Sequence, residues 1–248
     1  MKAWLRTALL GLGLGAMPAL GESDSFGLGS GRDGPLVVRE PGRVLNRYAQ
    51  VLGPTAPGDS VLLVAGTEGF SPGDLVMVLQ VTGLVPEPVP GGHTPIGLSR
   101  DAVGQWEFAR LSASGGGTLT LTAPLVGAYA AGVTQVIRVP EYTRLRIQDG
   151  AEIRAEPWNG RTGGVVAFLA TGAVINDGSI SATGAGFRGG RHEPELFPPS
   201  LCLGLPVEAR PGARKGEGIA VTQYGPGATG REAVTHGGGG GLCPLAGG

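Results

Sequence analysis

The sequence predicts an all-β fold: a small antiparallel β-barrel or sandwich, followed by short β-helix-like rungs and a glycine-rich tail. Two observations carry this prediction. Short apolar segments separated by glycine and proline turns fill residues 35–140, without a convincing helical pattern. Two segments within residues 141–190 then repeat one design, in which an apolar strand, an Asp-Gly pair and a second strand follow one another.

The repeated segments are Leu145–Ala155 and Val174–Ala182. In the first, apolar residues alternate with polar ones, the period of two expected of a half-buried strand. The Asp-Gly pairs predict tight turns, because glycine tolerates positive φ. A rung with one apolar face cannot bury that face alone, so stacking as in a parallel β-helix is expected. The alternative is a β-meander within a sandwich. Between the rungs, the apolar run Gly163–Ala170 predicts a strand covered on both faces.

Residues 35–140 are assigned to the small antiparallel domain. Pro35–Val38 opens its first strand, and Val44–Leu52 is expected to be extended. The run Leu75–Leu79 lacks polar alternation and predicts a central, covered strand. Pro140 is expected to mark the seam with the rungs. Further strands are expected at 60–64, 106–108, 118–122 and 135–139, with Trp106, Phe108 and Met77 in the core.

The N-terminus predicts export. Residues 1–21 combine Lys2 and Arg6 with a short apolar run and small residues near Gly21, which is the pattern of a secretory signal peptide. Residues 22–34 are expected to form a flexible leader. Removing Lys2 and Arg6 changes the formal net charge from −1 to −3, and no basic cluster suggests nucleic-acid binding. No later stretch is long and apolar enough for a transmembrane helix, so no anchor is expected after signal removal.

Residues 191–248 form a proline- and glycine-rich tail, which is expected to be mobile unless a partner or a disulfide orders it. Cys202 and Cys243 lie in this tail. In an exported chain they are candidates for a disulfide, because pairing is the default outside the cytoplasm. The opposing interpretation is a pair of free or intermolecular thiols.

No catalytic, cofactor-binding or metal-ligating residue is predicted. Asp149 and Asp177 are the obvious carboxylates of the rungs, but a turn role accounts for both. The three histidines lie in different loops, and the glycine run 237–241 lacks the residues of a phosphate-binding loop. Trp106 or Trp158 could form a sugar-binding platform, although buried aromatic residues are commoner. The histidines are His93, His192 and His236.

An ordered series of motifs resembles a family of secreted glycine-rich proteins from myxobacteria and their relatives, some of them labelled adventurous gliding motility proteins (AgmC-like). The resemblance covers roughly residues 30–243. It implies an exported protein without assigned catalytic residues. Family members usually continue with more glycine-rich sequence, so a truncated member is expected here. The motifs are Gly69–Asp74, Trp106–Arg110, Ala123–Leu125, Gln135–Pro140, Gly163–Phe168 and Gly186–Gly190.

These observations lead to two hypotheses of function. The first is a non-enzymatic, secreted or cell-surface structural and interaction protein of the bacterial envelope or matrix, with protein or polysaccharide partners; the resemblance adds an association with motility. The alternative is a carbohydrate-binding or polysaccharide-cleaving β-helix protein. Exposed aromatic residues along one face of the rungs would favour the alternative.

Overall fold

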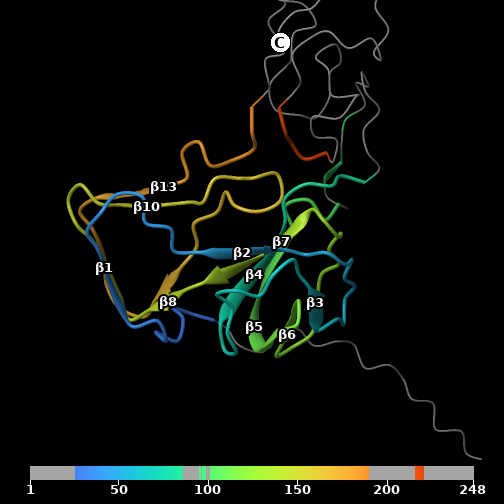
Figure 1. Cartoon of the computed structure of the whole chain (residues 1–248), viewed down its shortest axis with the longest axis horizontal. Helices are drawn as coiled ribbons and strands as arrows, with labels where there is room; N and C mark the ends of the chain where they lie inside the picture. The colour runs from blue at the N-terminus through green and yellow to red at the C-terminus, as the bar shows by residue number, and fades with distance from the viewer. Residues whose placement is uncertain (1–25, 86–94, 96, 99–100, 190–215, 221–248) are drawn as a thin grey trace, which may run out of the picture.

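The computed structural model describes residues 26–85, 95, 97–98, 101–189 and 216–220. Their fold is all-β, as predicted, and no α-helix occurs among them. It consists of a curled antiparallel sheet and a stack of parallel strands beside it (Figure 1). Within the described chain, no helix could cross a membrane.

The curled sheet contains six antiparallel strands in the spatial order β2-β7-β4-β5-β6-β3. Its two edges meet where Val51 bridges Val64 and the amide of Leu52 donates to the carbonyl of Leu63 at 2.8 Å. This contact curls the sheet towards a barrel rather than a two-sheet sandwich. The strands are β2 (Arg47–Gln50), β3 (Val61–Leu63), β4 (Leu75–Gln80), β5 (Trp106–Gly115), β6 (Thr118–Leu121) and β7 (Thr134–Val139).

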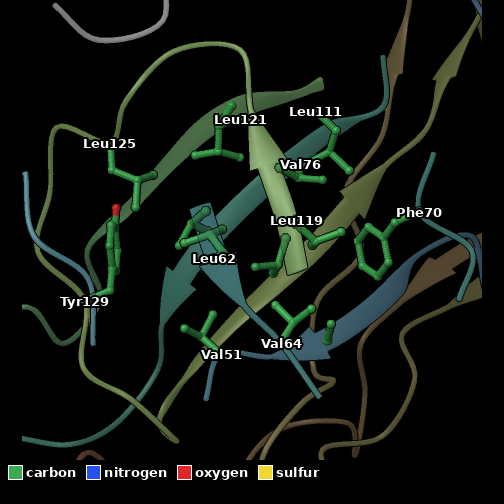
Figure 2. Packing of buried hydrophobic residues seen from close by; sticks show 14 residues of the cluster. Val51, Leu62, Val64, Phe70, Val76, Leu111, Leu119, Leu121, Leu125 and Tyr129 are labelled. Atoms are coloured by element: carbon green, nitrogen blue, oxygen red, sulfur yellow. The ribbon is translucent and has the colours of Figure 1, made fainter. Parts of the chain in front are cut away.

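Alternate side chains of these strands fill the interior of the barrel (Figure 2). Leu119 and Leu121 point inward while Thr118 and Thr120, which alternate with them, stay half-buried, the period of two that the sequence predicted. Burying a leucine or valine fully stabilises a fold by about 1.5–3 kcal/mol. The cluster comprises Ala49, Val51, Leu62, Val64, Phe70, Val76, Val78, Ala109, Leu111, Leu119, Leu121, Leu125, Tyr129 and Val136.

The prediction that Trp106, Phe108 and Met77 lie in this core is wrong. Val76 and Val78 point into the barrel, so Met77 between them points out. Met77 pairs with Phe108 across the sheet, and Trp106, two residues before Phe108, is 54% exposed. The run Leu75–Leu79 is apolar at every position. Such a run does not reveal which set of alternate side chains points into the core.

The parallel stack confirms the predicted rungs. One rung contains β8 (Glu141–Tyr142), β9 (Arg144–Ile147) and β10 (Glu152–Arg154); the next contains β11 (Leu169–Ala170), β12 (Val174–Asn176) and β13 (Ser179–Ser181). Each strand pairs in parallel with its counterpart one rung away. The β-meander alternative is therefore wrong, because consecutive strands of a meander pair antiparallel.

A further rung precedes these two. β1 (Pro35–Val38) pairs in parallel with β9, and Arg43 forms a parallel bridge with Ile153. Assigning Pro35–Val38 to the antiparallel domain was therefore wrong. The barrel, residues 47–139, is an insertion between the first and second rungs. Four residues, PLVV, do not show that their partner lies more than a hundred positions away in the chain.

The rungs have a small core of their own. It consists of buried residues from the first two rungs, with Leu36, Val166 and Phe168 packed against it. The ring centroids of Tyr142 and Phe168 lie 6.5 Å apart. The buried members are Val38, Leu45, Tyr142, Leu145, Ile147, Ala151 and Ile153.

The two Asp-Gly pairs need glycine for different reasons. Gly150 has a φ of +73° and open space where a Cβ would lie. Gly178 does not have a positive φ, but a Cβ there would lie 2.2 Å from the carbonyl oxygen of Ala151 and 2.5 Å from that of Gln148. The second turn therefore requires glycine because the rungs are in close contact there, and not because of its φ.

We expect Gly178→Ala to destabilise the fold by about 3 kcal/mol, the upper range for overpacking, because backbone must shift. Gly150→Ala is the matched control and is expected to cost about 1 kcal/mol, the cost of a left-handed alanine. Urea denaturation of both variants measures the difference. Equal losses would contradict the close-contact explanation.

Candidate functional site

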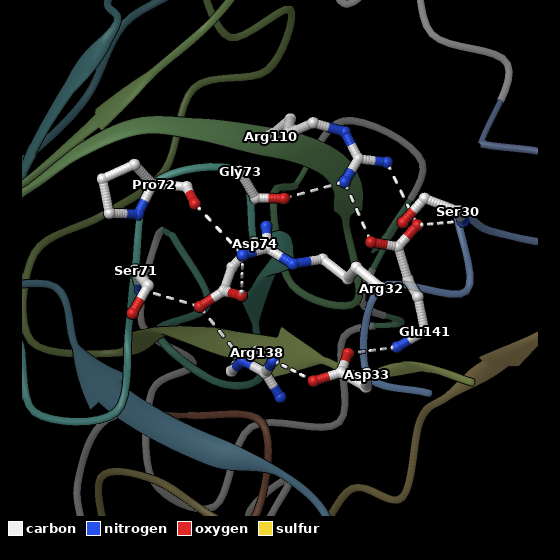
Figure 3. A network of polar contacts seen from close by, with 10 residues as sticks. All are labelled: Ser30, Arg32, Asp33, Ser71, Pro72, Gly73, Asp74, Arg110, Arg138 and Glu141. Carbon is white, nitrogen blue, oxygen red and sulfur yellow. Dashed lines mark hydrogen bonds and ion pairs between the residues drawn. The ribbon is translucent and has the colours of Figure 1, made fainter. Parts of the chain in front are cut away.

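A network of polar side chains lies where the barrel joins the rungs (Figure 3). Arg110 of β5 and Glu141 of β8 form a two-pronged ion pair, with nitrogen–oxygen distances of 2.9 and 3.1 Å. Glu141 is fully buried, and its carboxylate also accepts the amide of Ser30 at 2.7 Å. One carboxylate thus joins the chain before the first rung, the barrel and the second rung.

A second ion pair network lies beside it. Arg138 of β7 pairs with Asp33 and, through Nε at 3.0 Å, with Asp74. The other carboxylate oxygen of Asp33 accepts the amide of Glu141 at 2.7 Å. Residues 26–34 are therefore not the flexible leader predicted for 22–34. Asp33 pairs with a residue 105 positions away and Arg32 pairs with Asp74, 42 positions away, and composition does not reveal such partners.

The electrostatics of this junction keep its groups charged. Burial alone would raise the pKa of Glu141, but hydrogen bonds from Arg110 and Ser30 outweigh burial, and the pKa is lowered. Burial alone would lower the pKa of Arg138, but the carboxylates of Asp74 and Asp33 outweigh burial and raise it. The charged forms of Glu141 and Arg138 therefore stabilise their partners, and the paired charges hold the barrel against the rungs.

Buried amides make a second attachment between the two units. The side chain of Gln135 donates to the carbonyl of Gly163 at 3.1 Å and accepts its amide at 2.9 Å. Asn46 does the same with Ala167, at 2.7 and 3.1 Å. Between them, the hydroxyl of Tyr48 donates to the carbonyl of Val165 at 2.5 Å, and burial raises the pKa of Tyr48 to about 12.

These contacts correct the prediction of a strand over Gly163–Ala170. Only Leu169–Ala170 belongs to a strand. Alternate residues of the preceding stretch bond to side chains of the barrel instead of to a neighbouring strand. Polar residues next to apolar strands, such as Gln135 and Glu141, were the sequence signal for this junction, since a buried polar group requires a partner.

Motifs that carry the family resemblance meet at this junction. Asp74 comes from the first of them, Arg110 from the second, and Gln135 and Arg138 from the fourth, while Gly163 opens the fifth. In this chain these motifs thus have a structural explanation, the attachment of an inserted barrel to a stack of rungs.

The carboxylates of the rungs lie at turns, as predicted. Asp149 is exposed, and Asp177 pairs at 3.3 Å with Arg146, both half exposed. The described residues contain no group of three His, Cys, Asp or Glu side chains that could hold a metal ion. Among these residues, Asp149 and Asp177 thus lie in turns, and Asp177 is paired with Arg146.

The two tryptophans considered as sugar-binding platforms, Trp106 and Trp158, differ in exposure. Trp158 is 5% exposed and packs edge-on against Phe187, with ring centroids 5.8 Å apart, so it cannot serve as an open platform. Trp106 is exposed and lies 5.2 Å from Phe108 by ring centroid. It belongs to the barrel, so it does not form the row of aromatics along the rungs that would favour a carbohydrate-binding β-helix.

The last described rung has an open end. Val174 lies in register with the fully buried Leu145, and Ile180 lies in register with the fully buried Ile153. Yet Val174 is 45% exposed and Ile180 is 42% exposed. Apolar side chains in core positions therefore reach solvent, because no described strand pairs with the outer edges of β12 and β13.

Part of the predicted mobile tail is anchored. Glu217 is buried, accepts the amide of Arg188 at 2.9 Å and forms an ion pair with its guanidinium. Thr82 donates to the carbonyls of Gly218 and Ala220, at 2.8 and 3.0 Å. For residues 216–220 the prediction of mobility was wrong, because long-range polar contacts offset the entropy cost of ordering glycine.

Several predicted features lie outside the described residues. They are the signal peptide 1–21, the candidate disulfide Cys202 and Cys243, the glycine run 237–241, and the histidines His93, His192 and His236. The disulfide and the signal peptide stay predictions.

No protein-family model and no curated protein matches the chain. Among solved structures, it is similar to the tailspike gp61 of Pseudomonas phage phi297, with 15% identity over 60% of this chain and 23% of that chain and a TM-score of 0.29. The tailspike gp54 of Acinetobacter baumannii phage AP22, solved with a capsular saccharide, has 14% identity over 54% of this chain and 22% of that chain, and a TM-score of 0.31.

A third tailspike, gp49 of Pseudomonas phage LKA1, has 12% identity over 55% of this chain and 29% of that chain, with a TM-score of 0.26. The chain thus spans about a quarter of the length of these proteins. At such scores and identities, the similarity carries no inference about the activity of this chain.

Proposed function

We propose that the protein is a non-enzymatic structural and interaction module of the bacterial cell exterior, which binds other polypeptides through the open end of its third rung. The observation that carries the proposal is the exposure of Val174 and Ile180 in positions that neighbouring rungs bury. Exposed strand edges beside apolar side chains are templates for a further strand.

The two ends of the stack differ, which supports a single binding end. In the first rung the position aligned with Ile153 is Arg43, and β1 begins with proline. A charge and a proline both discourage strand addition at an edge. In the third rung the aligned residue is Ile180. The occupant we propose is therefore a β-strand of a neighbouring polypeptide, added at the third rung.

After β13 the described chain continues to pair with the second rung and does not cover the outer edge of β12 or β13. After β13 the carbonyl of Ala185 accepts the amide of Trp158 at 2.9 Å, and Arg188 bonds to Glu217. Export and a location in the envelope or matrix complete the proposal, supported by the signal-peptide pattern and by the resemblance to secreted glycine-rich proteins. A part in gliding motility belongs to the same proposal and rests on that resemblance alone.

The test introduces a charge at the open end. We expect the double variant Val174→Asp, Ile180→Asp to move from the cell-bound fraction into the culture fluid, and to lose the high-mass crosslinked species of the wild type. Val61→Asp is the matched control, because Val61 is 52% exposed on the barrel. Western blots of fractionated, crosslinked cells measure both effects.

The proposal is contradicted if all three proteins distribute alike or if the wild type is monomeric and unbound. Sedimentation of the purified chain decides whether a second copy can be the neighbouring polypeptide. Slow hydrogen exchange at the edge amides of β12 in the isolated monomer would instead mean that the chain covers its own third rung, which would also refute the proposal.

A further inference from the structure

An open cleft of about 800 Å³ lies along the seam between the barrel and the rungs. Tyr48 and Gln50 of β2 and the loop residues Thr67 and Glu68 line one side. Asn159 and Arg161, from the turn that precedes the docked stretch 163–167, line the other side. Boundaries between structural units are common places for ligand sites.

The polar groups around this cleft are held in place by bonds to the rest of the fold. Tyr48 is fixed by its bond to the carbonyl of Val165, and the Nε2 of Gln50 donates to the carbonyl of Gly132 at 2.8 Å. The Oδ1 of Asn159 accepts the amides of Arg161 and Thr162, at 2.9 and 3.0 Å. A ligand would therefore meet three preorganised side chains, those of Tyr48, Gln50 and Asn159, which lowers the entropy cost of contacting them.

Two charges of opposite sign face the same cleft without neutralising each other. Among the described residues, the side chains of Glu68 and Arg161 form neither a hydrogen bond nor an ion pair, and both are exposed. This sets them apart from the junction, where every charged group shown in Figure 3 has a partner.

This chemistry restricts the ligand. Because Glu68 and Arg161 carry opposite charges, they give the cleft no net charge that would attract a polyanion or a polycation. A neutral chain rich in hydroxyl groups suits both, because a carboxylate accepts hydroxyl hydrogens and a guanidinium donates to hydroxyl oxygens. Tyr48 adds a half-buried aromatic ring, the apolar element that sugar rings contact.

We propose that this cleft binds a neutral oligosaccharide, with Glu68, Arg161 and Gln50 as its main hydrogen-bonding residues. The site is separate from the open end of the third rung. Binding a glycan at the seam and binding a polypeptide at the rung end are therefore independent, and one can fail without the other.

The experiment uses the mature full chain on a printed array of neutral and acidic oligosaccharides, followed by calorimetric titration with the strongest neutral binder. We expect Glu68→Gln and Arg161→Ala each to weaken binding at least tenfold. Two exposed residues outside the cleft, Glu40 and Arg154, provide the matched controls Glu40→Gln and Arg154→Ala, which should bind as the wild type does.

An array without neutral binders overturns the proposal, as do binding by acidic glycans alone and unchanged affinity in both cleft variants. Trp106→Ala is added to test the exposed aromatic side chain on the barrel as an alternative sugar-binding surface. Loss of binding in that variant, with the cleft variants unaffected, would place the sugar on the barrel and refute the cleft site. None of these substitutions touches Val174 or Ile180, so failure here leaves the proposed assembly untouched.

Discussion

Replacing Glu141 by glutamine is expected to destabilise the protein by about 3 kcal/mol. The substitution keeps the shape of the side chain but leaves the guanidinium of Arg110 without its buried counter-charge, and breaking a buried ion pair from one side typically costs about 3–5 kcal/mol. Arg110 keeps its bond of 2.9 Å to the carbonyl of Gly73, so the lower end of that range applies. Urea denaturation at pH 7 measures the loss.

The same residue predicts a dependence on pH. Because the pKa of Glu141 is lower in the folded protein than in the unfolded chain, its ionised form stabilises the fold above about pH 4.3, the unfolded value. This contribution is lost as the pH falls through the folded pKa. The wild type should therefore lose stability on acidification more steeply than Glu141→Gln.

The control is Glu156→Gln, which changes an exposed glutamate and should alter stability by no more than about 0.5 kcal/mol. Two results would speak against a structural ion pair at the junction. One is equal stability of Glu141→Gln and the control at pH 7. The other is a stability curve of Glu141→Gln that falls in acid as steeply as that of the wild type.

Replacing Asn46 by alanine should destabilise the protein by a similar amount, because the substitution leaves buried backbone groups without hydrogen-bond partners. Its buried amide bonds both polar backbone groups of Ala167 and donates to the carbonyl of Arg138 at 2.9 Å. Each buried group left without a partner costs about 1–3 kcal/mol. We therefore expect Asn46→Ala to destabilise the protein by about 4 kcal/mol, measured by urea denaturation.

Hydrogen exchange gives a local readout of the same change. The amide of Ala167 should exchange much faster in Asn46→Ala, while amides of β4 in the barrel keep their relative protection. Asn176→Ala is the control, since Asn176 lies in the exposed strand β12. If Asn46→Ala is as stable as Asn176→Ala, water satisfies the freed groups and the side chain is not needed to hold the docked stretch.

The features that local sequence could predict are those that depend on near neighbours. Leu145 and Ile147 alternate with polar residues, so their strand and its buried face were readable, and the Asp-Gly pairs marked the turns of both rungs. Pro140 marked the seam after β7, because proline cannot extend a ladder by its own N–H.

The candidate sites depended on distant neighbours and were largely missed. Asp33 and Glu217 lie in polar, glycine-rich stretches whose composition suggested mobility, yet their partners Arg138 and Arg188 order them. Trp106 was expected inside because aromatic residues are usually buried. The side chains of β5 alternate between the two faces of the sheet, however, and Trp106 lies on the outer face. The cleft of Glu68 and Arg161 joins residues 93 positions apart, and no local pattern connects them.

By itself, the sequence determined the all-β class, the two Asp-Gly rungs and the approximate extent of the antiparallel strands, since turns and the period of two are local properties of the chain. Only the tertiary structure decided that the first rung precedes the barrel, that the barrel is an insertion, and that no strand of the described residues covers the third rung. Strand partners and buried ion pairs join residues far apart in the chain, so they are selected by packing and charge in three dimensions.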